Sequence, residues 1–135
     1  MAKNEEVPQI NEVNRIAGGT ELRGTLITTS DIRIDGFFEG KIQTKGKVVV
    51  GENAQFIGDL FCGSADIWGR MEGNLVTGHQ AGFKSKAKFE GALQCNKIFI
   101  EDGAVFNGTC RMITEEEYNQ MADKYNSSTR KQKQQ

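Results

Sequence analysis

Side chains that carry out chemistry are scarce in this 135-residue chain. It has one histidine, His79, and three cysteines, Cys62, Cys95 and Cys110, with no CxxC pair among them. An odd number of cysteines at such spacing predicts reduced, mostly buried thiols and not a disulfide framework or a metal site. No GKS or GKT phosphate loop and no GxSxG nucleophile motif is present. We therefore expect no catalytic residue, no cofactor and no bound metal.

Long apolar runs are also missing, and neither sign of charge dominates. No stretch approaches the ~20 apolar residues that cross a bilayer, and no basic start leads into an apolar segment of the signal-peptide type. Lysine and arginine number 17 against 18 aspartates and glutamates, so the chain lacks the basic excess of a nucleic-acid binder. These features predict a cytoplasmic protein, in the cell interior or at the inner face of the cytoplasmic membrane.

Glycine, in contrast, is abundant and regularly placed, with 16 glycines against a single proline. Six glycines share one frame, in which an apolar or cysteine side chain stands two residues away on both sides. They are Gly24, Gly40, Gly58, Gly73, Gly91 and Gly108, separated by 16, 18, 15, 18 and 17 residues. A unit this short cannot bury a core by itself, so its copies must stack on one another.

Within each unit, apolar and polar residues alternate, which is the period of a β-strand with one buried face. The frame predicts two inward columns of side chains. One is Leu22, Phe38, Phe56, Met71, Phe89 and Phe106, and the other is Leu26, Ile42, Leu60, Leu75, Leu93 and Cys110. Small residues before the first column, and glycine beside Asp or Asn between the arms, predict corners. The prediction is an all-β fold, a single-stranded β-helix (β-solenoid) of about six short turns, one per glycine of the frame.

Both ends of the chain lack the repeat. Residues 1–17 are predicted to be a disordered leader, and residues 18–113 the β-helix domain. Thr114 followed by three glutamates is a helix N-cap with acids in the first turn, which predicts a short helix over residues 114–125. Residues 126–135 are predicted to be a disordered basic tail, so flexible polar tails flank the solenoid.

The units at residues 16–26, 34–42 and 104–109 resemble those of the bactofilins, and the likeness covers about residues 16–113. The resemblance implies a right-handed, roughly triangular β-helix that polymerises end to end into filaments without a nucleotide. It also implies a bacterial cytoskeletal scaffold that organises cell shape or cell-wall and polar machinery. The implied partners are further copies of the chain, cell-wall enzymes and membrane-associated proteins. Many bactofilins carry an N-terminal membrane-binding segment, whereas the leader here is polar and acidic.

The ends of the predicted solenoid also favour self-assembly, by an argument that does not use the resemblance. A solenoid without capping structure exposes strand edges and an open core at its first and last turns. The leader has few apolar residues and the predicted helix is acidic, so neither resembles a cap. The predicted polymerisation interface consists of Leu22, Leu26, Ile32 and Ile34 at the first turn and Phe106, Cys110 and Met112 at the last. Head-to-tail and head-to-head joining both agree with the repeat.

Two sets of outward residues have more than one interpretation. Lys84, Lys86 and Lys88 point outward together, either for solubility or for contact with anionic lipid or an acidic partner. A set of large apolar residues falls on the polar phase of the alternation, as ordinary surface residues or for lateral bundling or docking of a partner. These are Phe37, Val49, Ile57, Phe61, Trp68 and Phe99.

Two other classes of function stay open, a β-solenoid acyltransferase-like enzyme and a monomeric solenoid binding module. Hexapeptide acyltransferases need an apolar residue every six positions, a period that gaps of 15 to 18 residues do not hold. His79 is predicted to lie in a corner loop, with no acidic neighbour in sequence to orient it as a base. Filament formation without nucleotide would separate the scaffold from both alternatives, and a monomer at high concentration would favour the binding module.

Overall fold

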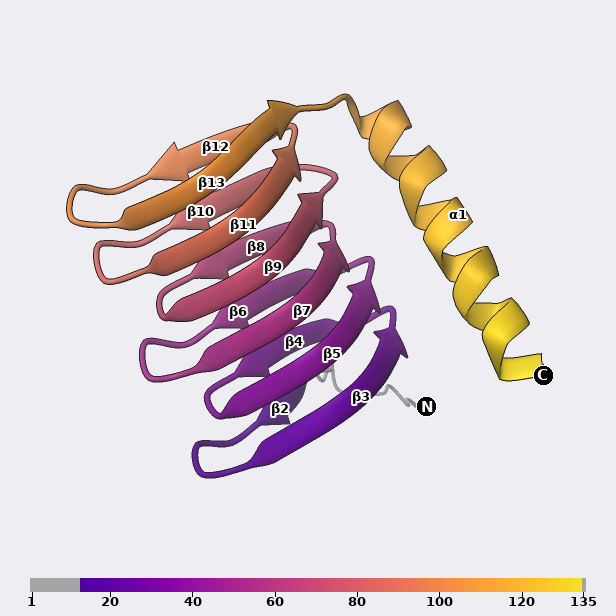
Figure 1. The fold of residues 1–135 in the computed structure, drawn as a ribbon, viewed down its shortest axis with the longest axis horizontal. Coiled ribbons are helices and arrows are strands. Elements are labelled where there is room, and N and C mark those ends of the chain that lie inside the picture. The colour runs from indigo at the N-terminus through magenta and orange to yellow at the C-terminus, as the bar shows by residue number, and fades with distance from the viewer. Residues whose placement is uncertain (1–12, 135) are drawn as a thin grey trace, which may run out of the picture.

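A computed structural model describes residues 13–134, with side chains as far as Lys124. Short and long strands alternate along the chain and stack into a rod, with β2 and β3 at one end and β12 and β13 at the other (Figure 1). The short strands are β2 (Val13–Ile16), β4 (Asp31–Ile34), β6 (Lys47–Val50), β8 (Ser64–Ile67), β10 (Gln80–Phe83) and β12 (Lys97–Ile100). The long strands are β3 (Glu21–Thr28), β5 (Phe37–Thr44), β7 (Gln55–Cys62), β9 (Arg70–Thr77), β11 (Lys88–Cys95) and β13 (Val105–Met112).

Each kind of strand forms its own parallel sheet. The short strands pair in the order β12-β10-β8-β6-β4-β2, and the long strands in the order β13-β11-β9-β7-β5-β3. One short and one long strand make a turn, so the described residues form a β-solenoid of six turns, as the repeat predicts. The register is the predicted one, because every glycine of the frame pairs with the next, from Gly24 with Gly40 to Gly91 with Gly108.

These six glycines bend the long strands. Each is the fourth residue of its strand and has φ between 127° and 148°, a region that L-residues rarely adopt. A Cβ at the second to the sixth of them would lie closer than 3.0 Å to the carbonyl oxygen of the glycine one turn below. The bend divides each long strand into two arms and, together with the short strand, gives every turn its three sides.

The interior consists of columns of equivalent side chains, as predicted. Phe38, Phe56, Met71 and Phe89 lie in the first column and are almost fully buried. The second column and the two columns of the short strands are equally buried in the middle turns. Corners form where small residues were predicted; for example, Ala54 donates its backbone N–H to the carbonyl of Gly51 at 3.0 Å.

The predicted start of the repeat domain needs correction, whereas its predicted end at residue 113 agrees with β13, which ends at Met112. The leader was expected to extend to residue 17, but Val13–Ile16 forms β2, which pairs with β4 and belongs to the first turn. The inner face of β2 carries Asn14 and Ile16, in register with Ile32 and Ile34 of β4, and only Ile16 of the two is apolar and buried. One buried apolar residue is a weak signal, which is why the sequence did not predict this strand. The remainder of the predicted leader, residues 1–12, lies outside the described residues.

The helix after the solenoid is longer than predicted. It was expected over residues 114–125, but α1 runs from Glu115 to Gln134, through the segment predicted to be a disordered tail. No glycine or proline follows Gly108, so nothing in the sequence ends the helix at residue 125. The predicted N-cap is present, since Thr114 Oγ1 accepts from the N–H of Glu117 at 3.1 Å and Glu117 Oε1 accepts from the N–H of Thr114 at 2.9 Å.

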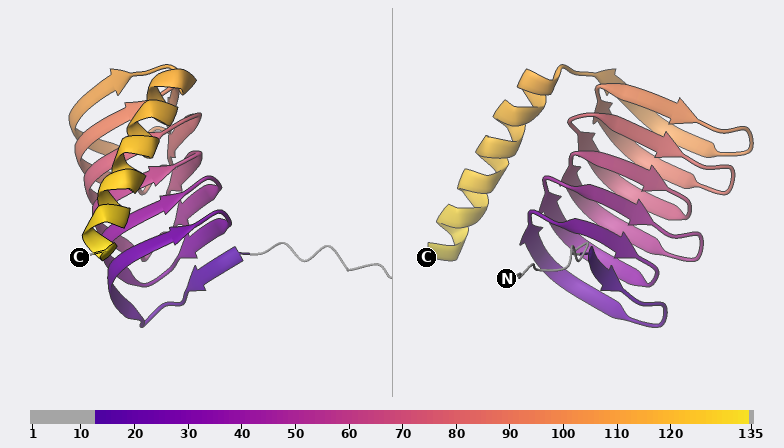
Figure 2. Two further views of the ribbon diagram at one scale, coloured as in Figure 1. Left: turned by 90° about the vertical axis from the view of Figure 1, so that its right-hand side faces the viewer. Right: turned by 180° about the vertical axis from the view of Figure 1, so that it is seen from behind.

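α1 lies along one flank of the rod and not across its end. It starts beside the last turn and runs back toward the first, opposite to the direction in which the chain climbs through the turns (Figure 2). It packs on the outer side of the long strands, where Tyr118 forms a buried cluster with Phe61, Val76 and Ile113. Both ends of the solenoid are therefore left without a helical cap among the described residues.

Candidate assembly interface

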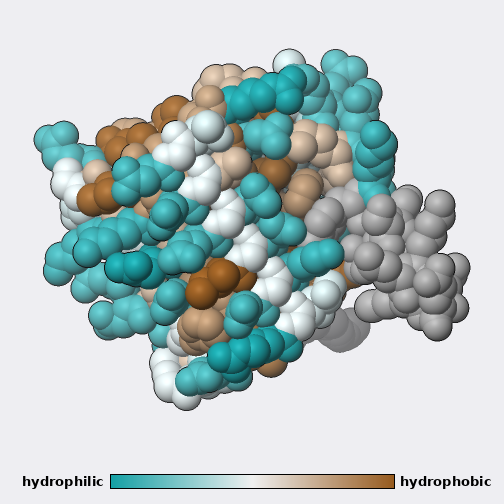
Figure 3. All heavy atoms as spheres, viewed as in Figure 1, coloured by the Kyte–Doolittle hydropathy of each residue, from teal (hydrophilic) through white to brown (hydrophobic). Residues whose placement is uncertain are grey.

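The C-terminal end of the solenoid exposes side chains that are core residues in every turn below. Within residues 13–134, β13 pairs only with β11, so its other edge faces outward. In β11 the inward residues Phe89, Leu93 and Cys95 are at most 1% exposed. One turn higher, Met112 is 54% exposed and Cys110 is also exposed. Apolar surface accordingly gathers at this end of the molecule (Figure 3).

Phe106 is the last ring of an aromatic stack. It lies 5.0 Å from Phe89 in a stacked arrangement and 5.6 Å from Phe83 edge to face, measured between ring centroids. Further down the same column, Phe38 and Phe56 stack at 5.3 Å. Because Phe106 is only half-buried, this end of the rod presents an aromatic surface of the kind that carries binding energy when covered.

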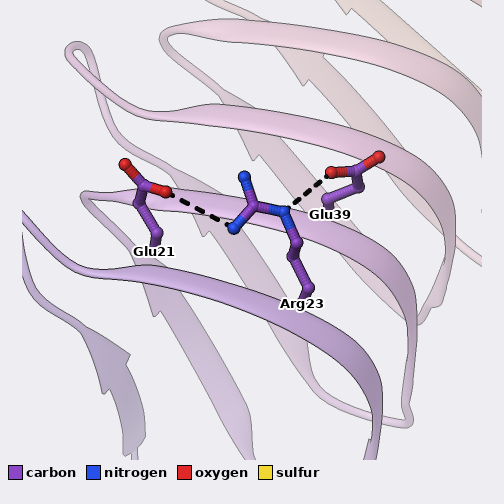
Figure 4. A network of polar contacts seen from close by, with 3 residues as sticks. All are labelled: Glu21, Arg23 and Glu39. Carbon is purple, nitrogen blue, oxygen red and sulfur yellow. Dashed lines mark hydrogen bonds and ion pairs between the residues drawn. The ribbon is translucent and has the colours of Figure 1, made fainter.

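The N-terminal end is the counterpart, formed by β2 and β3. Leu22 is 42% exposed and Leu26 is half-buried, whereas Phe38 and Ile42 one turn above are buried. Charged residues lie on the outer side of the same strand. Arg23 contacts Glu21 at 3.4 Å and Glu39 at 3.1 Å, which ties the first turn to the second (Figure 4).

Five of the seven residues predicted for the interface lie at an open end of the solenoid. Leu22 and Leu26 share the N-terminal end, and Phe106, Cys110 and Met112 share the C-terminal end. Ile32 and Ile34 were assigned to the first turn, and this placement is wrong. They lie in β4, which β2 covers, and are 1% and 0% exposed.

Sequence reasoning also missed end residues on the short strands. Ile98 and Ile100 belong to β12, the last strand of its sheet, and Ile100 is 45% exposed. Ile16 of β2 takes the place in the first turn that Ile34 takes in the second. The sequence did carry a signal for these residues, because an apolar pair follows each glycine unit. Ile98 and Ile100 form the last such pair, and they belong to the last turn once the turns are counted from β2.

The three cysteines are free thiols, as predicted, but one of them is not buried. Burial raises the pKa of Cys62 well above its usual range. Burial, with a contribution from the neighbouring Cys110, raises the pKa of Cys95 to about 12. Both thiols therefore stay protonated and unreactive at neutral pH, and Cys110 at the C-terminal end is the exposed one.

The predicted basic surface of Lys84, Lys86 and Lys88 is partly neutralised. Lys84 lies 3.9 Å from Glu101 and Lys86 lies 3.8 Å from Glu52. The Nζ of Lys84 also stands 5.3 Å from the ring centroid of Trp68 and 5.9 Å from that of Phe99. Contact of these lysines with an anionic surface stays a prediction, which vesicle pelleting of a triple Lys→Ser variant would test.

The structure gives His79 an acidic neighbour that the sequence did not predict, since Glu115 of α1 lies 3.2 Å from its Nε2. Both side chains are mostly exposed, so this is a surface contact between the start of α1 and the corner before β10 and not a buried catalytic pair. No group of three or more His, Cys, Asp or Glu side chains that could hold a metal ion occurs among the described residues. No helix in the part of the chain that the structure describes is long and apolar enough to cross a membrane.

Among the described residues, the β-solenoid is uninterrupted and exposes core positions and strand edges at both ends, as a stack of repeats without terminal caps does. A family model described as "Bactofilin: Polymer-forming cytoskeletal" matches residues 14–111. The chain belongs to the bactofilin family and is a polymer-forming cytoskeletal protein. It is similar to Bactofilin BacO of Myxococcus xanthus (strain DK1622), with 28% identity over 101 residues that cover 75% of this chain and 80% of that relative. No solved structure matches the chain.

Proposed function

We propose that this chain assembles end to end into filaments without a nucleotide and serves as a cytoplasmic scaffold for cell shape or for cell-wall and polar machinery. The observation that carries the proposal is the pair of open ends. Five of the six turns have every inward column covered by a turn above, and the sixth ends in exposed Cys110, Met112 and Ile100. A second subunit placed on this end would supply the missing turn.

This contact between the ends of two subunits, which we call the joint, can form without energy from nucleotide hydrolysis. Complete burial of a large apolar side chain is worth ~1.5 to 3 kcal/mol, so completing the burial of half-exposed Leu22, Ile100 or Met112 contributes about 1 kcal/mol each. Backbone hydrogen bonds between the two strand edges add on the order of 1 kcal/mol each. Apolar contact and strand pairing together stabilise the joint, and neither depends on hydrolysis of a bound nucleotide.

The roles of partners follow from the shape of the polymer. A filament repeats the outer surface of one subunit at regular intervals, so a weak contact with an enzyme or membrane-associated protein is multiplied along its length. Cell-wall enzymes at the inner membrane face are the partners that a scaffold for cell shape would position. In this proposal the chain itself performs no reaction.

The test is assembly in buffer free of nucleotide, followed by sedimentation and negative-stain electron microscopy. Wild-type protein should pellet as filaments, whereas Phe106→Arg should stay in the supernatant, because a guanidinium cannot be buried in the joint. Phe99→Arg is the matched control, since Phe99 is 53% exposed on the outer face of the same turn. Intact filaments of Phe106→Arg would refute the proposal.

A second variant guards against loss of folding. Phe106 packs on two rings, so its replacement can destabilise the monomer, whereas Met112 is 54% exposed and its replacement removes little packing. Met112→Glu should keep the thermal midpoint of the wild-type monomer and still fail to assemble. Filaments of folded Met112→Glu would equally contradict end-to-end joining.

A further inference from the structure

Three sulfur-containing side chains lie together at the C-terminal end of the solenoid. They are Cys95 at the end of β11, and Cys110 and Met112 in β13. All three residues hold inward positions, since Cys95 pairs with Met112, and Cys110 pairs with Leu93 of the core. We call Cys95, Cys110 and Met112 the sulfur cluster.

The register of the two strands sets the spacing within the sulfur cluster. Paired Cα atoms such as those of Cys95 and Met112 lie ~4.8 Å apart, and Cys110 stands ~6.6 Å from Met112 along the same strand. The side chains of Cys95 and Cys110 form a hydrogen bond with each other. Side chains on one interior face at these spacings can direct their three sulfur atoms at a single ion.

The sulfur cluster has a buried floor and an open mouth. Cys95 is 0% exposed, whereas Met112 is 54% exposed and Cys110 is also exposed. Within residues 13–134 no strand lies above β13, because β13 pairs only with β11. A small ion can therefore reach the three sulfur atoms from the end of the rod.

The type of donor atom determines which metal suits the cluster. Ca²⁺ and Mg²⁺ take oxygen ligands, and a structural zinc site takes four ligands, most often from Cys and His. The described part of the chain has no group of three or more His, Cys, Asp or Glu side chains that could complete such a site. Thiolate and thioether sulfur atoms, in contrast, are the soft ligands that select Cu(I).

A disulfide is a less suitable product of the same two thiols. Cys95 and Cys110 are diagonal neighbours, one strand and two residues apart, so their Cα atoms lie ~8 Å from each other at the usual spacings. Disulfides need Cα atoms within ~7 Å. A metal ion between the sulfur atoms spans the longer distance without a movement of the backbone.

We propose that Cys95, Cys110 and Met112 form a Cu(I) site, and that occupation of this site opposes joining at the C-terminal end. Binding forms one bond from Cu(I) to each of the two thiolates and one to the thioether. Both S–H bonds break, two protons pass to the solvent, and no atom changes its oxidation state. Burial raises the pKa of Cys95 to about 12, so the metal itself has to displace this proton.

Occupation of the site changes the charge of the end surface. Two neutral thiols become two thiolates that share one Cu⁺, which leaves a charge of −1. The sulfur cluster belongs to the surface that the joint buries, and burial of an unpaired charge is costly. This effect on joining rests on the proposed function, whereas the binding of copper does not.

Copper binding is measured with the full chain under anaerobic conditions, below the concentration at which the chain pellets. Cu(I) is supplied as its coloured complex with the chelator bicinchoninate, and the loss of colour gives the copper that the protein removes. Wild-type protein is expected to remove one equivalent. One bound equivalent should also block the reaction of Cys110 with Ellman's reagent.

Variants that copy a neighbouring turn test the thiol ligands while they keep the fold. Cys110→Leu copies Leu93, its partner in β11, and Cys95→Thr copies Thr77, which ends β9 as Cys95 ends β11. Each of these variants should remove no copper. Cys62→Thr is the matched control, because Cys62 ends β7, two turns below Cys95, and this variant should still remove one equivalent.

The thioether ligand has its own test. Met112→Leu should remove less copper than wild-type protein at the same chelator concentration, and equal removal would overturn the three-sulfur arrangement. Unchanged colour with wild-type protein, or copper removal by Cys95→Thr or Cys110→Leu, would overturn the site itself. Circular dichroism shows that each variant is folded before it is titrated.

Sedimentation tests the effect on assembly. Wild-type protein should pellet without copper and stay in the supernatant once one equivalent is bound, whereas Cys95→Thr should pellet in both conditions. Pelleting of copper-loaded wild-type protein would overturn this effect. Failure of the wild-type protein to pellet without copper would instead contradict the proposed function, and the copper titration of the same protein would still decide the site.

Discussion

The glycine column offers the sharpest test of how the turns fit together. A Cβ on Gly58 would collide with the carbonyl oxygen of Gly40 one turn below, whereas a Cβ on Gly24 meets nothing within 4 Å, because no turn lies below it. The two positions have nearly the same backbone, with φ of 138° at Gly58 and 146° at Gly24. Replacing each by alanine therefore separates the collision from the backbone strain.

The expected difference can be worked from these two contributions. Strain at a positive φ costs about 1 to 3 kcal/mol and applies to both variants. Overpacking against a fixed backbone typically adds about 1 to 3 kcal/mol, and applies only to Gly58→Ala. The Gly58→Ala monomer should thus be less stable than the Gly24→Ala monomer by about 2 kcal/mol, which in a chain of this length lowers Tm by a further ~6 to 10 °C.

Thermal unfolding followed by circular dichroism, in the Met112→Glu background that keeps the subunit unassembled, measures this difference. Sedimentation without that background measures the second consequence. The methyl group of Gly24→Ala lies on the N-terminal end face, so it should raise the concentration needed for assembly although the subunit folds. Equal Tm values would refute the collision, and wild-type pelleting of Gly24→Ala would refute a glycine column that continues across the joint.

Three further outcomes are expected. In the folded monomer Ellman's reagent should titrate Cys110 alone and filaments should protect it, because burial raises the pKa of the other two thiols; a second fast thiol would contradict this. Burial, with a lesser contribution from Cys62, raises the pKa of Tyr118 above its ordinary value of 10.0. Its stabilising contribution is thus complete below pH 10 and is lost progressively as the pH rises from 10 through the raised pKa. Ultraviolet titration should show one tyrosine that ionises at higher pH than the other, and Tyr118→Phe should abolish it. Thr114→Ala should cost α1 about 1 kcal/mol by loss of the cap, seen as earlier melting of the helical signal, whereas Gln120→Met, at an exposed position past the first turn, should leave it unchanged.

The repeated part of the fold could be predicted because each turn carries the same information. Six copies of one frame determine the register, so that Phe56 had to lie above Phe38 and Gly58 above Gly40. A single strand of alternating residues would have left both its partner and its facing surface undefined. The repeat also made the residues of the C-terminal end predictable, since Phe106 and Cys110 are the last members of their columns.

What could not be predicted depends on contacts without a repeat. β2 contains half a unit and no glycine of the frame, so Ile32 and Ile34 were counted as the first turn when they belong to the second. Phe61 seemed an ordinary surface residue because the helix that covers it follows 57 residues later, at Tyr118. Contacts of this length leave no period in the sequence, and only the packed structure shows them.

The position of α1 has a consequence for how such a chain can change in length. Every middle turn presents the same interior to its neighbours, so a duplicated unit can be inserted without a new core having to evolve. The described side chains of the helix, however, tie it to Ile113 after the last turn and to Phe61 and Gln43 of earlier turns. Turns added before Phe37 leave these contacts intact, whereas turns added after Val76 carry the helix away from its seat. Insertion of turns in the course of evolution is therefore tolerated near the N-terminal end and restricted near the C-terminal end. The number of turns can vary at one end of the stack and is fixed at the other.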